Sequence, residues 1–260
     1  MLSIMSYYNP LDTARKVYSI VARVVDSVEE RKYYRFRGGR WYGGIATGDA
    51  VGCNLKCKFC WAWRVRDNPD KSGFFYKPID VYHKLMRIVR KRRYRQVRVS
   101  GCEPTISRLH LLQLLEHFSY EKITFILETN GILIGADKSY AKELSKYKNL
   151  YVRVSLKGTN EEEFHYLTGA DPQAFNLQLK ALEHLLDYGV PCHPAVMLSF
   201  STKENYNKLI ERIREIDEEL SEEIEEEYVF LYPHVIEIMR RHGLKPKIAY
   251  TPDNIPEELI

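Results

Sequence analysis

Short apolar stretches alternate with amphipathic segments along most of this 260-residue chain. The short stretches suit buried strands, and the longer segments carry apolar residues three or four positions apart, as helices do. Strands that alternate with helices favour a parallel sheet, and right-handed crossovers curl such a sheet toward a barrel. The sequence predicts six strands, at residues 45–51, 96–100, 123–127, 151–155, 194–198 and 228–232.

Six strand–helix units are fewer than a closed barrel of this kind contains. The predicted fold class is therefore α/β, with a partial, TIM-like (β/α)6 barrel over residues 43–233. Residues 1–42 form a predicted N-terminal extension, with a helix that Asp12 caps, an apolar helix face from Val17 to Val28, and a following strand. Residues 234–260 form a predicted C-terminal extension, a helix and a tail that lies over the barrel.

Three of the five cysteines stand close together, at Cys53, Cys57 and Cys60, in the loop predicted after the first barrel strand. Thiolates select zinc, copper(I) and iron–sulfur clusters over harder ions, so a CxxxCxxC loop points to a metal–sulfur centre. The odd cysteine count and the absence of a signal-peptide pattern argue against a disulfide framework. Structural zinc is an alternative, with Cys102, Cys192 or a distant histidine as the fourth ligand.

Three thiolates leave one iron of a [4Fe–4S] cluster without a protein ligand, whereas electron-transfer clusters are held by four. The CxxxCxxC spacing, the aromatic Phe59 and the later sequence Gly101-Cys102-Glu103-Pro104 resemble the radical S-adenosylmethionine (SAM) superfamily over about residues 43–233. The resemblance implies that the three cysteines ligate three irons and that SAM chelates the fourth. It also implies the same partial barrel, and reductive cleavage of SAM to a 5′-deoxyadenosyl radical that abstracts hydrogen from a substrate.

The resemblance further implies SAM contacts where the strands end, which is where barrel active sites lie. In this interpretation Phe59 packs near the adenine, Lys157 pairs with the SAM carboxylate, and the backbone after Gly101 receives the SAM amino group. Cys102 replaces the second glycine of the family motif, and its Cβ narrows the accessible dihedrals. Core packing is the alternative for Phe59 and Met197, and a surface position for Lys157. The predicted cofactor-binding residues are Phe59, Gly101, Cys102, Glu103, Pro104, Glu128, Thr129, Asn130, Ser155, Lys157, Met197 and His234.

Within the superfamily, the sequences at 128–131, 155–157 and 164–169 look most like the glycyl radical enzyme activases, including the pyruvate formate-lyase activating enzyme. Two features depart from that pattern: the segment before the cysteines lacks Asp-Gly-Pro-Gly, and Ser155 stands where the activases have Asp. An activase-like reaction on a substrate protein is the first hypothesis.

Modification of a nucleoside or tRNA is the second hypothesis. Cys60-Trp61 has some likeness to the wybutosine-forming radical SAM enzyme, and Glu-Thr-Asn-Gly also occurs in 7-carboxy-7-deazaguanine synthases. The basic residues from Arg87 to Arg98 could follow phosphates, although such a run also suits the solvated end of a helix. A non-catalytic iron–sulfur electron carrier is the hypothesis from another class.

The net charge of +4 favours no particular partner. Free thiols and an oxygen-sensitive cluster suit a reducing compartment, so we expect a cytoplasmic protein. No apolar run reaches the roughly 18 residues that span a bilayer, so no membrane partner is expected. The resemblance implies an iron–sulfur oxidoreductase that a ferredoxin or flavodoxin reduces, and we expect a monomer.

Overall fold

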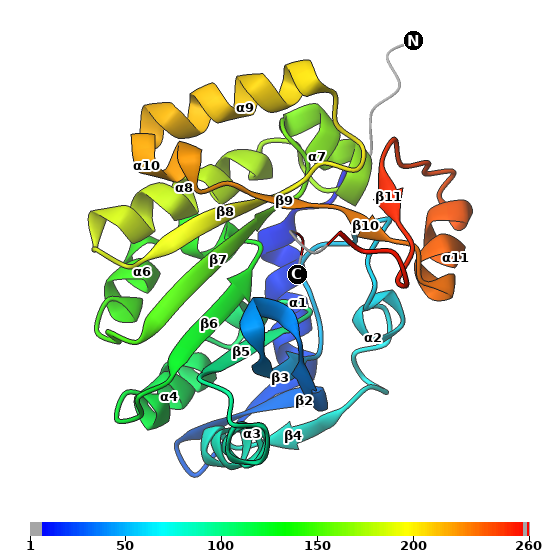
Figure 1. The fold of residues 1–260 in the computed structure, drawn as a ribbon. Coiled ribbons are helices and arrows are strands. Elements are labelled where there is room, and N and C mark those ends of the chain that lie inside the picture. Colours follow the sequence, from blue (N-terminus) through cyan, green and yellow to red (C-terminus); the bar gives the residue numbers. More distant parts are fainter. Residues whose placement is uncertain (1–6, 257–258, 260) are drawn as a thin grey trace.

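The computed structural model describes residues 7–256 and residue 259. Its main feature is one sheet of nine strands in the order β1-β2-β3-β5-β6-β7-β8-β9, with β4 paired to β2. In Figure 1 the sheet curls into an open arc with helices along its outer side. The strands are β1 (Ala22–Val25), β2 (Val28–Gly39), β3 (Ile45–Ala50), β4 (Phe74–Tyr76), β5 (Gln96–Gly101), β6 (Thr124–Thr129), β7 (Leu150–Leu156), β8 (Cys192–Met197) and β9 (Glu225–Glu227).

The six strands β3, β5, β6, β7, β8 and β9 pair in parallel with their neighbours. At the other edge, β2 pairs antiparallel with β3. No strand in the described part of the chain joins β9 back to the opposite edge, so the barrel is open. The predicted α/β fold with a partial (β/α)6 barrel is confirmed, whereas its division into 1–42, 43–233 and 234–260 stays a prediction.

Helices cover the outer face of the sheet. Outward side chains such as Val99, Leu127 and Val154 belong to the same buried apolar cluster as Leu115 and Leu182 of the helices. Because successive side chains on a strand point to opposite faces, the residues between them face the interior of the barrel. The helices are α1 (Pro10–Val21), α2 (Trp63–Arg66), α3 (Pro78–Arg92), α4 (Arg108–Phe118), α5 (Ile132–Ala136), α6 (Lys138–Leu144), α7 (Glu161–Thr168), α8 (Ala174–Asp187), α9 (Lys203–Ile216), α10 (Glu218–Glu222) and α11 (Pro233–Arg241).

The sixth barrel strand differs from its prediction. It is β9, a run of three glutamates, and not residues 228–232. Val229–Phe230 forms β10, which pairs with β11 (Ala249–Tyr250) in a separate two-stranded sheet. In register, β9 places Glu225 beside Ala195 and Glu227 beside Met197, so two carboxylates face the barrel interior. The apolar residues of 228–232 led the prediction to the wrong segment, because the true edge strand borders a polar cavity and therefore carries glutamates.

The N-terminal helix is also shorter than predicted. It ends at Val21, and its cap is Asn9, whose side chain accepts from the Leu11 amide at 2.8 Å; Asp12 lies in the first turn. The chain then turns back as the β1–β2 hairpin. Val24 is therefore a strand residue, 58% exposed. The spacing of the valines had placed it on the apolar face of the helix.

Gly135 is where α5 packs most closely on α8. A Cβ at this position would collide with the Leu177 carbonyl oxygen and lie 2.7 Å from the carbonyl carbon. Overpacking of this kind costs about 2 kcal/mol, so we expect Gly135→Ala to lower the free energy of unfolding by that amount in urea titrations. The control is Gly39→Ala, whose Cβ would meet nothing nearer than 3.4 Å. Equal stability of the two variants would contradict this account of the α5–α8 contact.

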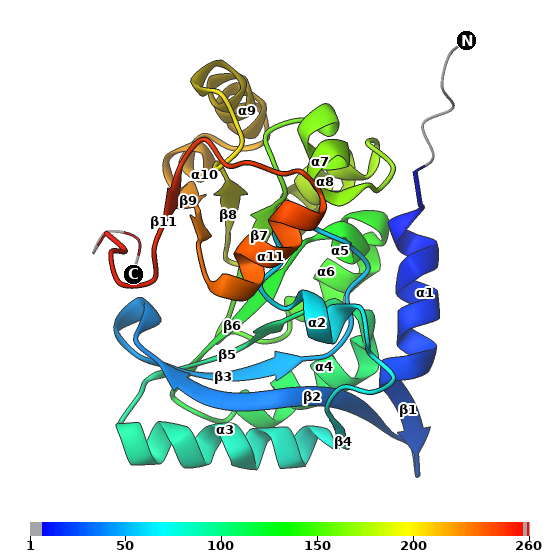
Figure 2. The same cartoon turned by 90° about the vertical axis from the view of Figure 1, so that its right-hand side faces the viewer.

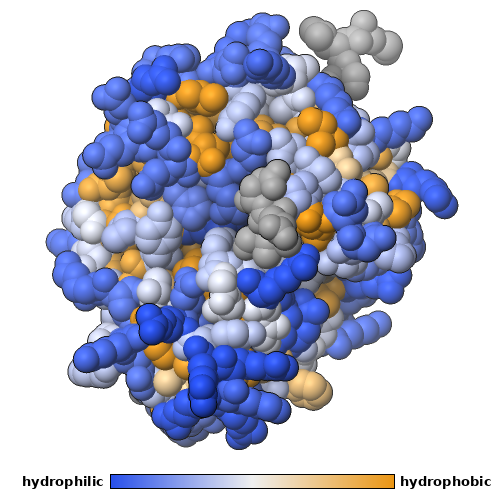
Figure 3. All heavy atoms as spheres, viewed as in Figure 1, coloured by the Kyte–Doolittle hydropathy of each residue, from blue (hydrophilic) through white to orange (hydrophobic). Residues whose placement is uncertain are grey.

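Helices α2 and α11 lie together on the open side of the arc (Figure 2). The Trp63 indole Nε1 donates to the His234 carbonyl oxygen at 2.9 Å, and Arg64 pairs with Glu237 at 2.7 Å. The face seen in Figure 3 is mostly hydrophilic, with hydrophobic residues in small separate patches. Among the described residues, no helix has the length and apolar character needed to cross a bilayer.

Candidate active site

A cavity of about 1100 Å³ lies at the carboxyl ends of the parallel strands. Its lining includes the three cysteines of the CxxxCxxC loop and every predicted SAM-contacting residue except Pro104. Pro104 is buried in a short 3-10 helix, Pro104–Ile106, which follows the lining residue Glu103. Residues predicted from the ends of five strands are thus brought to one place, and their contact with a cofactor stays a prediction.

The cysteine loop is irregular, and contacts from distant segments hold it. The Lys58 amide donates to the Leu167 carbonyl oxygen at 2.9 Å, and the Lys56 amide donates to the Tyr8 hydroxyl at 2.8 Å. The Arg66 Nη1 donates to the Cys57 carbonyl oxygen at 2.7 Å. These contacts fix the backbone that presents the three thiols.

The donor set of this loop fits an iron–sulfur cluster. Thiolates are the usual protein ligands of iron–sulfur clusters, and Cys53, Cys57 and Cys60 are free thiols that line one cavity. The Leu55 amide points at Cys53 Sγ from 3.4 Å, the kind of hydrogen bond that stabilises a thiolate ligand.

Burial keeps these thiols protonated until a metal replaces the proton. It raises the pKa of Cys57 to about 11 and also raises the pKa values of Cys53 and Cys60 above the usual range. Metal binding to such cysteines releases protons.

The turn after β5 requires one special backbone conformation. Gly101 has φ +95°, and a Cβ there would lie 2.8 Å from the Ala50 amide nitrogen. Cys102 does not have a positive φ. Its Cβ therefore fits the turn, although the replacement of a glycine at this position had put that in question. The Glu103 carboxylate accepts from Thr129 Oγ1 at 2.7 Å and from the Asn130 amide at 2.8 Å, and so ties the end of β5 to the end of β6.

Asn130 is held from two sides at the edge of the cavity. Its Nδ2 donates to Asn54 Oδ1 at 2.7 Å, next to Cys53, and its carbonyl oxygen accepts from Gln178 Nε2 at 2.6 Å. Asn54 Nδ2 is buried and has no hydrogen-bond partner among the described residues. This buried N–H donor within the cysteine loop suits a site in which a bound group supplies the missing hydrogen-bond acceptor.

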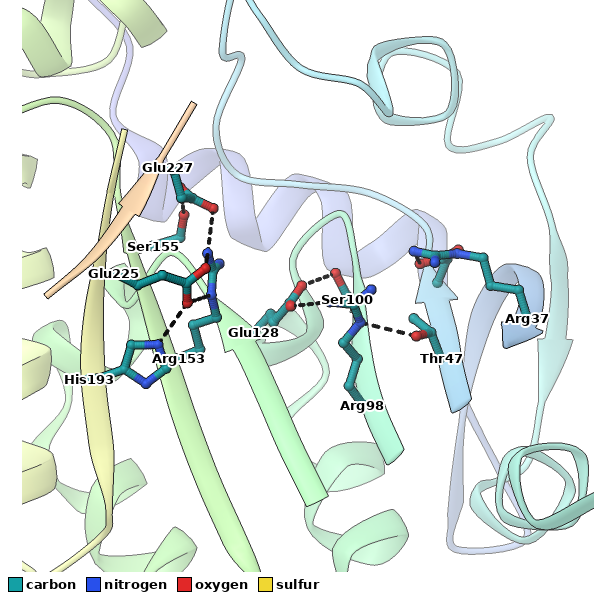
Figure 4. Close-up of polar contacts among 11 residues, drawn as sticks. Arg37, Thr47, Arg98, Ser100, Glu128, Arg153, Ser155, His193, Glu225 and Glu227 are labelled. Atoms are coloured by element: carbon teal, nitrogen blue, oxygen red, sulfur yellow. Dashed lines mark hydrogen bonds and ion pairs between the residues drawn. The ribbon is translucent and has the colours of Figure 1, made fainter. Parts of the chain in front are cut away.

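The interior of the barrel is lined by charged side chains in contact with one another (Figure 4). Arg98 on β5 donates to Thr47 on β3 at 3.0 Å and to Glu128 on β6 at 2.5 Å. Ser100 also donates to Glu128. Burial favours the neutral carboxyl, but Arg98 and Arg153 outweigh it and hold the pKa of Glu128 below its usual range.

A second charged group spans β7, β8 and β9. Arg153 donates to Glu225 through Nε and Nη2, both at 2.7 Å, and to Glu227 at 2.9 Å. His193 Nε2 lies 2.9 Å from Glu225 Oε2, and Ser155 donates to Glu227 at 2.7 Å. Burial opposes ionisation, yet the bonds from Arg153 and His193 lower the pKa of Glu225 to about 2.

The remaining predicted residues lie around the same cavity. Lys157 contacts Ser155 and lies 3.7 Å from Glu227. It is therefore not a free surface lysine, which was the alternative to a role at the cofactor. Met197 is 6% exposed at the end of β8. Phe59 packs against Phe200 with ring centroids 5.4 Å apart, so the role in packing is present whether or not a cofactor binds.

All three tryptophans stand near this cavity. Trp41 stacks on Phe230 with ring centroids 5.8 Å apart, and both residues line the cavity together with Trp61. Trp63 follows two residues later and contacts the backbone of the lining residue His234.

The sequence predictions missed the charged lining, although its signal was present. In 96–100 and 151–155, valines alternate with polar residues that include Arg98 and Arg153. The valines meet the helices, so the arginines must face inward. The charged lining residues that were missed are Arg35, Arg37, Arg66, Arg98, Arg153, His193, Glu223, Glu225, Glu226 and Glu227.

Residues 49–213 match the sequence model of the Radical SAM superfamily. The chain belongs to this superfamily. A cysteine-type anaerobic sulfatase-maturating enzyme of Clostridium perfringens is 29% identical over 177 residues, which are 64% of this chain and 46% of that enzyme. The radical SAM chain thus spans about half the length of the curated relatives it matches.

Solved structures share the fold of this radical SAM chain. SuiB of Streptococcus suis bound to S-adenosylmethionine has a TM-score of 0.52 at 23% identity, over 64% of this chain and 36% of SuiB. The structure of anSMEcpe with bound AdoMet and Cp18Cys peptide has a TM-score of 0.54 at 24% identity, over 72% of this chain and 50% of the other. Spore photoproduct lyase complexed with dinucleoside spore photoproduct has a TM-score of 0.58 at 11% identity, over 83% and 65%. The cofactors of the chain are those of its superfamily, SAM and a [4Fe–4S] cluster.

Proposed function

We propose that this radical SAM chain binds its cluster through Cys53, Cys57 and Cys60 and abstracts a hydrogen atom from a substrate in the cavity beside them. The observation that carries the proposal is that the three thiols and the polar ends of the parallel strands line one cavity. When bound, the reduced cluster would supply an electron to the sulfonium of SAM, and SAM would supply a 5′-deoxyadenosyl radical. Reduction by a ferredoxin or flavodoxin belongs to the same proposal.

The protein's own residues orient the reactants and exclude water in this proposal. Gly101 lets the chain turn close to β3, and in this proposal the backbone of that turn receives the SAM amino group. Phe59 packs near the adenine. Glu128, Thr129 and Asn130 provide polar contacts to the ribose, and Ser155 with Lys157 provides those to the carboxylate. Met197 and His234 complete the adenosyl pocket.

We propose a peptide segment of a protein as the substrate. The curated relatives are named as sulfatase-maturating enzymes, and the anSMEcpe structure holds a peptide. An activase-like reaction is one form of this proposal, since it also takes hydrogen from a protein.

The basic stretch does not favour a nucleic-acid substrate at this cavity. Its exposed cations lie on α3 and in the loop after it, which precede β5 and so lie toward the amino end of the strands; they are Arg87, Arg90, Lys91, Arg92, Arg93 and Arg95. The cavity lies at the carboxyl end. Arg98, the last member of the stretch, is buried against Glu128.

An anaerobic SAM cleavage assay tests the proposed function. Protein reconstituted with iron and sulfide, then mixed with dithionite and SAM, is expected to form 5′-deoxyadenosine, measured by chromatography. Omitting dithionite is the control and should give none, because cleavage of the sulfonium needs an electron. A protein that holds a reducible cluster and yet forms no 5′-deoxyadenosine is an electron carrier, which contradicts the proposal.

A further inference from the structure

Two arginines at one side of the cavity share a single carboxylate. Asp49 on β3 is fully buried and accepts from Arg35 Nε at 2.6 Å, from Arg37 Nε at 2.9 Å and from Arg37 Nη2 at 3.3 Å. Both arginines extend from β2 and line the cavity. Two guanidinium groups against one carboxylate leave one positive charge uncompensated.

The other cations of the cavity are matched by acidic groups. Arg98 pairs with Glu128, and the two cations Arg153 and Lys157 face the two carboxylates Glu225 and Glu227. Arg66 pairs with Asp67. The excess positive charge of this cavity therefore lies on the β2 arginines, at the side where Figure 4 shows Arg37, across Thr47 and Arg98 from the Arg153 group.

The geometry points to a subsite for an anion on these arginines. Each guanidinium has five N–H donors. Within the described part of the chain, Arg35 donates one hydrogen bond and Arg37 donates two. The side chain of Arg35 is 44% exposed, so an incoming group can reach its free donors. The Trp61 ring lies 5.4 Å from Arg35 Cζ and restricts the guanidinium by stacking.

We propose that the substrate of this radical SAM chain carries a carboxylate that binds to Arg35 and Arg37, as an acidic residue near the reacting position of a peptide would. The inference rests on the proposed function and adds a chemical requirement on its substrate. A planar guanidinium fork matches a carboxylate in two parallel hydrogen bonds.

The opposite wall favours an acidic peptide over a nucleic acid. Glu223, Glu225, Glu226 and Glu227 line the cavity there, and only two of these carboxylates pair with Arg153. A phosphodiester chain that crossed the cavity would carry further negative charges toward that wall. A peptide can place one carboxylate on the arginines and neutral residues elsewhere.

Binding of matched peptides to the reconstituted protein with SAM tests the inference. Three dye-labelled peptides of about eleven residues would differ only at the two positions flanking a central alanine, which hold Glu, Gln or Lys, and fluorescence anisotropy gives each dissociation constant. We expect the wild type to bind the Glu peptide about tenfold tighter than the Gln peptide, the ratio for one charge-assisted hydrogen bond. The preference should shrink as salt is added.

Arg35→Gln is the informative variant, because Arg37 still pairs with Asp49 while the excess charge is lost together with one hydrogen bond to Asp49. The Glu-over-Gln preference should fall below about twofold, whereas Arg35→Lys, which keeps the charge, should retain part of it. Arg23→Gln is the matched control; Arg23 is 56% exposed on β1 and pairs with Glu30, so the preference should be unchanged.

Three outcomes would overturn the inference: equal binding of the Glu and Gln peptides by the wild type, an undiminished preference in Arg35→Gln, or tighter Arg35-dependent binding of a labelled thymidine dinucleotide than of the Glu peptide. Formation of 5′-deoxyadenosine is measured separately. A wild type that forms it but binds the peptides equally retains the proposed function and loses only this subsite.

Discussion

Replacing Cys57 with alanine is expected to abolish cluster loading and, with it, all formation of 5′-deoxyadenosine. Cys57 is buried in the middle of the three-thiol loop, and its carbonyl oxygen accepts a hydrogen bond from Arg66, so the variant removes one thiol from a loop whose backbone is held in place. A cluster held by three thiolates has no spare protein ligand, so we expect the loss of one thiolate to prevent stable binding. Iron and sulfide analysis with the visible absorption spectrum measures the loss.

Cys192→Ala is the matched control for this prediction. Cys192 is also buried, but it lies at the start of β8 and does not line the cavity. We expect this variant to load iron and sulfide as the wild type does. Full iron, sulfide and SAM cleavage in Cys57→Ala would refute the assignment of the loop.

Arg153→Ala is expected to lower the free energy of unfolding by about 3 kcal/mol, because it leaves two partly buried carboxylates without the cation that they share. The side chain of Arg153 is 9% exposed and that of Glu227 20% exposed, while that of Glu225 is 37% exposed, which keeps the loss at the lower end of the range for buried pairs. Urea unfolding followed by circular dichroism gives the value. Arg15→Ala removes a pair that is mostly exposed and should change stability by less than about 0.5 kcal/mol.

The pH dependence of the same variant gives an independent check. The folded-state pKa of Glu225 is about 2, below its ordinary 4.5, so its stabilising contribution is complete above pH 4.5 and is lost as the pH falls toward 2. Without Arg153 the larger part of this contribution is missing, and only the contact with His193 remains. The stability difference between wild type and variant should therefore narrow on acidification. A difference that is constant from pH 7 to pH 3 would show that lost packing, and not charge, causes the effect.

The fold was predictable because its strands alternate with helices in a regular pattern. The valines of 96–100 and 151–155 mark strands whose outward faces meet helices, and the structure has strands there. The sixth strand could not be found in this way. Glu225–Glu227 has the composition of a solvated segment, and only pairing with β8 and contacts to Arg153 make it a strand.

The part of the site that belongs to sequence motifs could be predicted. The cysteines and the strand-end residues, from Gly101 to Met197, come together as the parallel topology requires. The Arg35–Asp49–Arg37 cluster was out of reach, because it depends on the register of an antiparallel strand that no turn motif fixes. A β-bulge between Tyr33 and Arg35 shifts that register and sets which β2 side chains meet Asp49.

The grouping of all three tryptophans around one cavity makes the intrinsic fluorescence of this chain a local probe. Trp41 and Trp61 line the cavity, and Trp63 contacts the backbone of the lining residue His234. Their emission therefore reports on the part of the cavity near α2 and α11. If this part of the cavity opens before the helices unfold, the unfolding transition measured by tryptophan emission should precede the one measured by far-ultraviolet circular dichroism. Local opening of this enzyme can then be followed without any added label.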